Sequence, residues 1–167
     1  MPAAGFHLVQ WADLPDAPGA FSRWSTAAAL SELLHTYFAT AERSAAGIVR
    51  IRWRDGCPTL AIAGSSLSVV AMGRPSVELS GGQCAISVVV HGGLVVEPGS
   101  RPRLTVALDG HGSHVRALVD LADYEPRGGE LAAVRWLYLG TQARVHTWVG
   151  RRFLAQLRRR WSTGPIG

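Results

Sequence analysis

The sequence predicts an α+β fold: a curved antiparallel sheet of about six or seven strands around a long C-terminal helix, with two short N-terminal helices. Apolar residues recur at helical spacing over residues 20–45 and again over 131–157. Between these stretches a period of two dominates, broken by glycine-rich turns. Because each helical stretch has an apolar stripe and few other partners, we expect both to pack on the same sheet.

Length and composition indicate one globular domain. The chain has 167 residues, of which 47% are hydrophobic and 17% charged, so its core can be sizeable without disulfides. We expect a single domain over residues 1–167, with flexible ends at 1–4 and 161–167. Cys57 and Cys84 form neither a disulfide framework nor a metal-ligand pair, and we expect no cofactor and no metal.

The N-terminus and the arginines bear on location and partners. No basic and apolar leader opens the chain, and no run reaches the eighteen or so apolar residues of a membrane span. We therefore expect a cytoplasmic protein without membrane insertion. The net charge is +5, and the arginines at the C-terminus favour a solvated helix end that complements the helix dipole. Since no basic stripe is interleaved with exposed aromatics, we expect no nucleic-acid partner.

The N-terminal part contains a short strand and helices. Residues 5–11 predict an extended segment, followed by a turn over residues 14–19. Residues 20–45 predict two helices, with a cap at Ser25 or Thr26. Their core face is marked by apolar residues at helical spacing, namely Leu30, Leu33, Leu34, Tyr37, Phe38 and Ala41.

Strands follow from residue 48 onward. Residues 48–63 predict a hairpin, because apolar and arginine residues alternate up to the turn signal Asp55-Gly56. Two weaker strands are expected at 66–72 and 75–80. The last strands are expected at 83–97, with a bend at Gly92-Gly93, at 103–108 and at 114–124, with a turn over 109–112 between the final two.

The predicted helix at 131–157 carries two polar residues within its apolar stripe. Gln142 and His146 are four residues apart and therefore lie one turn from each other on one face. A buried amide or imidazole without a hydrogen-bond partner costs about 1–3 kcal/mol. Two interpretations stay open: strand groups satisfy these side chains as part of the core, or the side chains point into a cavity between helix and sheet.

Two groups of histidines differ in their surroundings. His91 lies in a hydrophobic strand beside the Gly-Gly bend, and such bends redirect side chains near sites. It is therefore a candidate for the cavity wall. His111 and His114 share a glycine-rich turn with Asp109, which is typical of a solvated loop rather than of a metal site. The sequence contains no nucleophile elbow, Walker loop, dinucleotide fingerprint or zinc-protease motif.

Aromatic residues complete the candidate site. Tyr and Trp combine apolar bulk with one hydrogen-bond donor, which suits pockets for mostly apolar ligands. Tyr138 projects on the same helix face as Gln142 and His146, and these three with His91 are our candidates for hydrogen bonding or acid–base assistance. The candidates for ligand contact are Trp53, Tyr124, Val145, Val149 and Phe153.

The order of elements resembles the helix-grip fold of the START-like, polyketide cyclase (SRPBCC) superfamily, over most of residues 5–160. The bend at 91–94, the strand exit at 123–127 and residues 142–154 are similar to actinobacterial members. The resemblance implies a deep cavity for an apolar small molecule or lipid. Any chemistry that it implies is cyclisation, dehydration or isomerisation, and no residue roles can be carried over because the superfamily has no universal catalytic motif.

The function predicted from these observations is binding of an apolar small molecule between the sheet and the C-terminal helix. The resemblance implies a cyclase or pericyclase of polyketide-type secondary metabolism, as in antibiotic biosynthesis. Such reactions need a shaped pocket and one or two hydrogen bonds but no nucleophile or metal, so the lack of a catalytic motif is compatible with this expectation. One alternative is a non-catalytic lipid or metabolite carrier. Another is an adaptor that uses Arg151 to Arg160 to bind a membrane or nucleic acid. The sequence does not decide whether the protein forms a homodimer.

Overall fold

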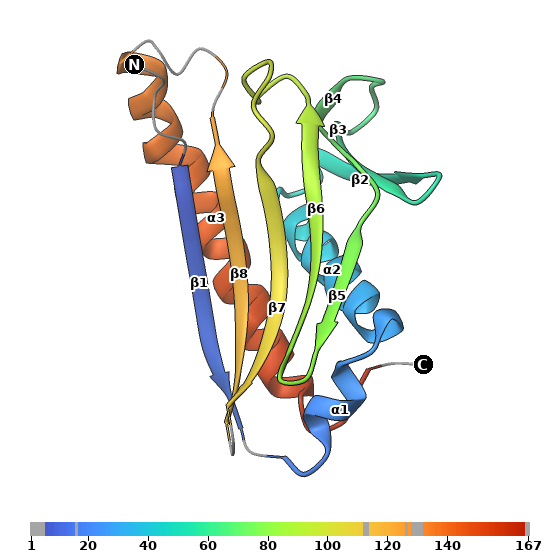
Figure 1. Ribbon diagram of the computed structural model, residues 1–167. Helices are drawn as coiled ribbons and strands as arrows, with labels where there is room; N and C mark the ends of the chain where they lie inside the picture. Colours follow the sequence, from blue (N-terminus) through green and yellow to red (C-terminus); the bar gives the residue numbers. More distant parts are fainter. Residues whose placement is uncertain (1–5, 16, 112–113, 126, 128–131, 166–167) are drawn as a thin grey trace.

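The computed structural model describes residues 6–15, 17–111, 114–125, 127 and 132–165, without the side chains of His111 and residues 132–143. It has the α+β architecture expected from the sequence, with two N-terminal helices, a large antiparallel sheet and a long C-terminal helix (Figure 1). The elements in chain order are β1 (Phe6–Leu14), α1 (Ala20–Trp24), α2 (Ala27–Ser44), β2 (Val49–Arg54), β3 (Cys57–Ile62), β4 (Ser68–Met72), β5 (Ser76–Ser80), β6 (Gln83–Gly92), β7 (Arg103–His111), β8 (His114–Tyr124) and α3 (Ala132–Arg160).

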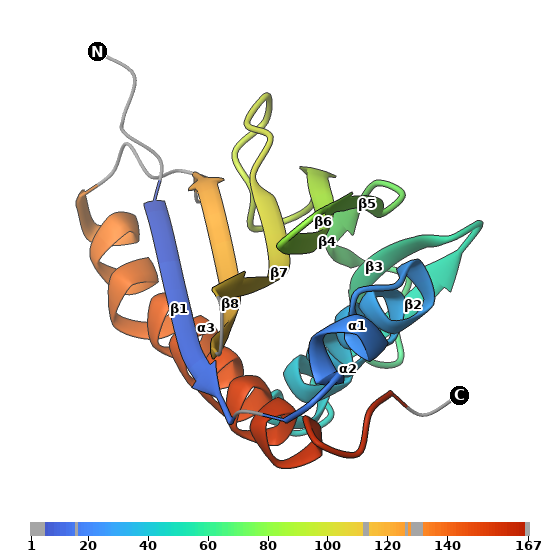
Figure 2. The same cartoon turned by 60° about the horizontal axis from the view of Figure 1, so that its bottom comes forward.

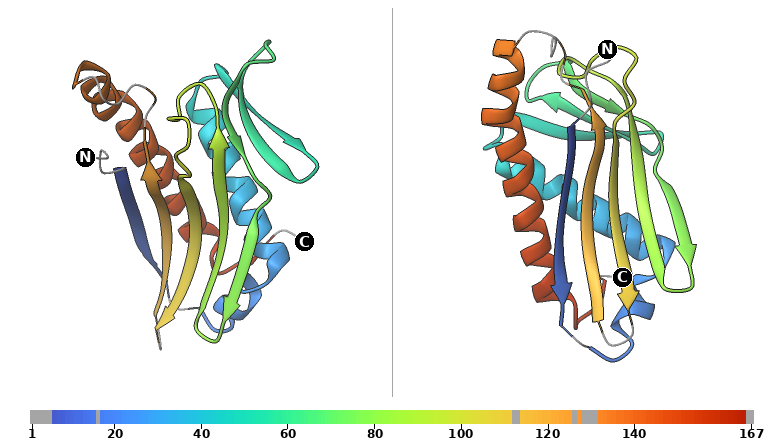
Figure 3. Two further views of the ribbon diagram at one scale, coloured as in Figure 1. Left: turned by 45° about the horizontal axis from the view of Figure 1, so that its top comes forward. Right: turned by 60° about the vertical axis from the view of Figure 1, so that its left-hand side comes forward.

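The described strands form one antiparallel sheet in the order β1-β8-β7-β6-β4-β3-β2. Strand β6 has two partners on one side: residues 83–87 pair with β5, whereas residues 90–92 pair with β4. The sheet therefore divides at the middle of β6. The branch with β4, β3 and β2 turns away from the plane of the other strands (Figure 3), which gives the sheet the curvature that the sequence predicted.

The hairpin between β2 and β3 is confirmed, and its turn has a simple cause. Asp55 and Gly56 connect the strands with φ values of 52° and 79°. Two-residue hairpin loops of this kind require positive φ at both positions, which Asp tolerates and Gly adopts freely. The turn pairs Arg54 with Cys57 and Val49 with Ile62.

Helices α2 and α3 lie on the concave side of the sheet (Figure 2). Thr26 caps the start of helix α2: its hydroxyl oxygen accepts a hydrogen bond from the Ala29 N–H at 3.1 Å and so satisfies one of the free amides of the first turn. The spacing noted in the sequence buries Leu30, Leu33 and Leu34 against the sheet and α3. Within the described residues, no helix is long and apolar enough to cross a membrane.

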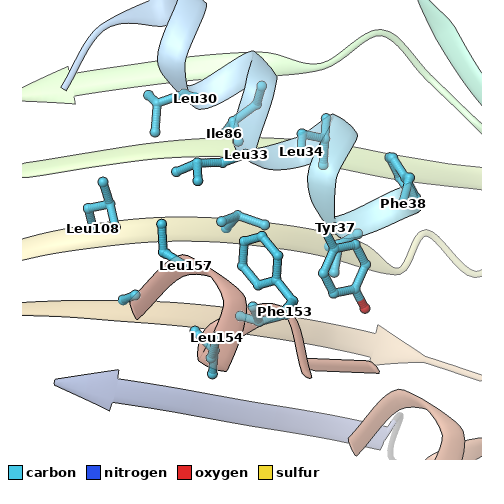
Figure 4. Close-up of a cluster of buried hydrophobic side chains, with 14 of the residues drawn as sticks. Leu30, Leu33, Leu34, Tyr37, Phe38, Ile86, Leu108, Phe153, Leu154 and Leu157 are labelled. Atoms are coloured by element: carbon cyan, nitrogen blue, oxygen red, sulfur yellow. The ribbon is translucent and has the colours of Figure 1, made fainter. Parts of the chain in front are cut away.

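The first half of α2 and the second half of α3 enclose a filled core (Figure 4). The Phe153 side chain is fully buried, and its ring meets the Tyr37 ring edge-on at a centroid distance of 5.6 Å. The side chains around this pair come from α2, from the sheet and from the last turns of α3, namely Leu30, Leu33, Leu34, Ile86, Leu108, Leu154 and Leu157.

The flexible end expected from residue 161 does not begin there. Trp161 is 1% exposed and stacks on Trp24 of α1 at a centroid distance of 6.0 Å. The Trp24 indole N–H donates to the Trp161 carbonyl oxygen at 3.2 Å. Two buried indoles remove a large apolar area from water, so this contact attaches the end of the chain to the N-terminal helix.

Two strand boundaries also differ from expectation. Strand β7 continues through Asp109 to His111, because Asp109 and Gly110 still pair with Arg116 and Val115 of β8. The expected turn over residues 109–112 is therefore largely strand. Strand β6 ends at Gly92 instead of continuing to residue 97, because the chain leaves the strand at Gly93 and passes along β4.

Candidate functional site

A cavity of about 270 Å³ lies between the second half of α2, the middle of α3 and the concave face of the sheet. It occupies the end of the interior opposite the filled core, and Tyr37 stands at the boundary between the two. Nearly all of its wall is aliphatic or aromatic. The described residues that line it are Tyr37, Phe38, Ala41, Ala45, Val49, Ile51, Leu60, Val69, Val70, Met72, Val90, Val95, Leu104, Leu121, Tyr124, Val145, His146 and Val149.

The alternation of the strands explains the apolar wall. In β6 the buried residues Ile86, Val88 and Val90 alternate with half-buried ones, and Val90 is the one that reaches the cavity. Strands β2 and β4 supply further aliphatic side chains from the branch of the sheet that turns away. Because α2 and α3 cover the sheet from one side only, the curvature leaves space that the side chains at this end do not fill.

The opening lies beside the exposed part of the lining. Val145 on α3 is 51% exposed although it lines the cavity. Across from it, Ala45 at the end of α2 and Val49 at the start of β2 are half-buried. A ligand therefore has a route into the interior between the C-terminal end of α2 and the middle of α3.

Among the α3 residues whose side chains are described, His146 is the polar one that reaches this cavity. A side chain of β1 holds this turn of the helix in place: the Gln10 amide donates to the His146 carbonyl oxygen at 3.2 Å. Gly150 lies against the same Gln10 side chain, where a Cβ would overlap the amide. Within the described part of the chain, neither imidazole nitrogen of His146 has a hydrogen-bond partner, so the ring is free to bond a ligand.

Burial lowers the pKa of the His146 imidazole below its usual value of 6.5, because the charged form loses hydration. The side chain is therefore neutral at physiological pH. A neutral imidazole has one N–H donor and one nitrogen acceptor. It can thus donate a hydrogen bond to a carbonyl oxygen or accept a proton, and it brings no charge into the apolar space.

This pKa predicts a pH dependence of stability. Well above pH 6.5 the imidazole is neutral in both the folded and the unfolded chain and contributes nothing to the dependence. Below it the unfolded chain binds a proton that the folded chain resists, so the free energy of unfolding falls, by at most about 1.4 kcal/mol per pH unit. Urea unfolding at a series of pH values, compared with His146→Gln, isolates this effect. An imidazole that titrates at or above 6.5 by NMR would contradict it.

Tyr124 forms the wall opposite His146, with the two rings 6.2 Å apart between centroids. Its hydroxyl donates to the Val95 carbonyl oxygen at 2.9 Å. Burial raises the pKa of this phenol to about 12, so it keeps its proton at any physiological pH. Tyr124 therefore ties the segment after β6 to the end of β8 and closes this side of the cavity.

The structure brings some of the expected site residues together and places others elsewhere. Val145, Val149, Tyr124 and His146 all line the cavity. Tyr138 and Gln142 belong to α3, but their side chains lie outside the described residues. The expectations for these two residues therefore stay predictions.

Three expected residues lie away from the cavity. His91 is exposed on the outer face of β6, where its ring packs over Gly73. Successive residues of a strand face opposite sides of the sheet, so His91 points away from the cavity that its neighbour Val90 lines. Phe153 belongs to the filled core. Trp53 is 37% exposed on β2, with its ring stacked on His35 at 4.0 Å.

Sequence reasoning missed most of the aliphatic wall. Ala41 is on the face of α2 that the helical spacing marked as core, and Leu104 and Leu121 are inward positions of alternating strands. Their pattern identifies them as buried. Nothing in that pattern distinguishes a residue beside an empty volume from one in a filled core, because both are apolar and face inward.

Comparison with known proteins assigns no family. No family model matches the sequence, and no curated protein matches it. Among solved structures, the chain is similar to that in the crystal structure of TTHA0849 from Thermus thermophilus, with a TM-score of 0.49 and 12% sequence identity over 93% of this chain and 97% of that one. A similarity at this level assigns neither a family nor an activity.

The expected absence of a metal site concerns only part of the chain. The described residues contain no group of three or more His, Cys, Asp or Glu side chains arranged to hold a metal ion. The turn with Asp109, His111 and His114 lies partly outside the described residues.

The C-terminal arginines differ in their surroundings. Arg160 forms an ion pair with Glu32 of α2 at 2.6 Å, whereas Arg151, Arg152, Arg158 and Arg159 are exposed.

Proposed function

We propose that the protein binds an uncharged, mainly apolar small molecule in the cavity between the sheet, α2 and α3. The observation that carries the proposal is the cavity itself: about 270 Å³ with a wall of apolar side chains and an opening beside Val145. Small-molecule sites are concave and mostly apolar, with a few placed polar groups. The resemblance to the SRPBCC superfamily agrees with ligand binding in such a cavity, and membership of that superfamily is part of the proposal.

The polar groups of the wall indicate which ligands fit. No Lys, Arg, Asp or Glu is among the described lining residues, so a ligand carboxylate or ammonium would enter without a counter-charge, at a large desolvation cost. His146 offers one hydrogen bond to an uncharged group such as a ketone, ester or hydroxyl. The Tyr124 hydroxyl proton is already directed to Val95, which leaves His146 to fix the orientation of the ligand.

A catalytic role is a second candidate that the neutral His146 imidazole favours. At the wall of this apolar cavity it can polarise a carbonyl, or accept a proton and return it, while the apolar side chains hold a reactive conformer. Cyclisation and pericyclic reactions of a polyketide-type substrate need little more than this. A carrier of the same fold would use the same hydrogen bond for affinity alone.

Filling the cavity should abolish binding without unfolding the protein. Ala41→Phe places a ring into the space from α2, whereas Ala39→Phe, two residues earlier, adds the same ring to the exposed face of the helix. With prodan, an uncharged naphthyl ketone dye, we expect fluorescence to report binding to the wild type and to Ala39→Phe but not to Ala41→Phe. Equal binding by both variants would place the ligand site elsewhere.

The same system tests charge selectivity. Anilinonaphthalene sulfonate has a similar aromatic size but carries an anion, and we expect it to bind more weakly than prodan at the cavity. Native mass spectrometry of the purified protein would identify a ligand that remains bound through purification. A co-purified fatty acid, bound as its carboxylate, would overturn the proposed preference for uncharged molecules.

Substitution on α3 separates enzyme from carrier. Once a ligand is identified, His146→Ala and Gln142→Ala are measured for both affinity and turnover. Loss of one hydrogen bond should weaken binding about 2- to 10-fold. In an enzyme, His146→Ala should also reduce kcat, whereas a carrier shows no turnover in any variant. If the ligand is turned over and neither substitution changes kcat, the assignment of these residues is wrong.

A further inference from the structure

Strand β1 leaves one side of the sheet open. It is nine residues long, pairs with β8 along one side, and has no strand on its other side within the described residues (Figure 1). In Figure 1 the first turns of helix α3 extend past the upper half of β1, whereas along the lower half the helix passes behind β8 and β7. An edge strand directs the backbone N–H and C=O groups of its outer side towards the position that a further strand would take.

The outward side chains of β1 are unusual for a protected edge. Val9 is 45% exposed and Trp11 56% exposed, although proteins commonly place charges or proline in such strands. His7 precedes this apolar pair and Asp13 follows it, on the same face. The face therefore carries an imidazole at one end, a carboxylate at the other and apolar side chains between them.

Two copies of this strand placed antiparallel to each other match in both their apolar and their polar side chains. We propose that β1 pairs antiparallel with β1 of a second copy of this chain, around a twofold axis at Gln10. In that register Val9 faces Trp11 of the partner subunit, and His7 faces Asp13 of the partner subunit. Each contact occurs twice, as a twofold interface requires. The two sheets then continue as one across the interface.

Neighbouring side chains extend the complementarity. Arg116 donates to the Asp13 carboxylate at 3.1 Å, and the His7 ring nitrogen lies 2.8 Å from a carboxylate oxygen of Asp120. Placing His7 next to the partner's Asp13 therefore lets acidic and basic or hydrogen-bonding groups alternate across the joined sheet. Opposite charges and apolar pairs across strands each contribute about 0.2–1 kcal/mol.

Other registers lose these contacts. A slip by one residue would turn the outward side chains of one strand to the inner face. A slip by two residues sets Val9 against its own copy or Trp11 against its own copy, and in both cases separates His7 from the partner's Asp13. The register centred on Gln10 alone forms the apolar and the polar pairs together.

Paired cysteine variants test this register. In a Cys57→Ser background, Val9→Cys and Trp11→Cys are prepared as separate proteins, since Cys57 is partly exposed and Cys84 is buried. Directly opposed residues in antiparallel strands have Cα atoms about 4.5–5.5 Å apart, within the range of a disulfide. We expect a disulfide-linked dimer when the two variants are mixed and oxidised, and none from either variant alone.

Sedimentation of the unmodified chain measures the association itself. We expect a dimer that Val9→Lys weakens by at least about tenfold in Kd, because a charge replaces one member of each apolar pair. The substitution Ala39→Lys on the exposed face of α2 should leave the Kd unchanged. Three results would overturn the proposal: a monomer across the micromolar range, a dimer insensitive to Val9→Lys, or cross-linking of either single cysteine variant with itself.

Discussion

Phe153→Ala is expected to lower the free energy of unfolding by about 3–5 kcal/mol. The ring is fully buried between α2, α3 and the sheet, in edge contact with Tyr37. Removing it leaves a void that the surrounding leucines, held in two helices, can fill only in part. The loss includes the transfer energy of the ring and the energy of the remaining cavity.

An exposed aromatic on the same helix provides the control. Trp148 is 46% exposed, with Arg152 over its ring at 5.1 Å. We expect Trp148→Ala to cost less than about 1 kcal/mol. Denaturant unfolding and thermal melts of both variants measure the difference, with about 2–4 °C in Tm for each kcal/mol in a chain of this length. Similar losses in the two variants would show that the Phe153 end of the interior is not the filled core.

Gly93→Ala is the second change with a large expected effect. Gly93 has a φ of 137°, a conformation that side chains rarely adopt. A Cβ there would overlap the Val69 carbonyl oxygen and lie 2.8 Å from the Val70 Cα. Because both obstacles are backbone atoms of β4, neither can move without displacing the strand. We expect a loss of at least about 2 kcal/mol in the free energy of unfolding.

The preceding residue separates strain from the general effect of adding a methyl group. A Cβ at Gly92 meets nothing within 4 Å, and its φ is ordinary. Gly92→Ala should therefore change stability by less than about 1 kcal/mol. Since the chain after Gly93 brings Val95 to the cavity, Gly93→Ala should also weaken prodan binding when the protein is still folded. Equal stability of the two variants would contradict the close approach of Gly93 to β4.

Periodicity predicted most of the fold because it reports which side of an element is buried. The alternation around Trp53 and the Asp55-Gly56 turn predicted the first hairpin, and the spacing from Leu30 to Phe38 predicted the buried face of α2. Periodicity could not predict the end of β6 at Gly92, because apolar residues continue beyond it to Val96. Only the close approach of Gly93 to β4 accounts for that boundary.

The candidate site was less predictable for a related reason. His146 was identified because a polar residue interrupts an apolar stripe, which is a local signal. His91 gave the same signal, yet it faces outward over Gly73. Direction in β6 depends on which of two alternating faces meets the helices, and the neighbours of Val90 are apolar on both faces. The sequence therefore located the polar residues but not the side of the sheet on which His91 lies.

The pairing of β1 with β8 has a consequence for how the chain folds during synthesis. Residues 6–14 are synthesised well before their partners at 115–124, and the α3 turn that Gln10 holds follows still later. Contacts this distant in sequence are slow to form. Until most of the chain has been made, β1 with its exposed Trp11 lacks the strand and helix that hold it. An unpaired strand with exposed apolar side chains favours aggregation, so the interval before β8 and α3 are complete is the stage at which this chain is most exposed to it.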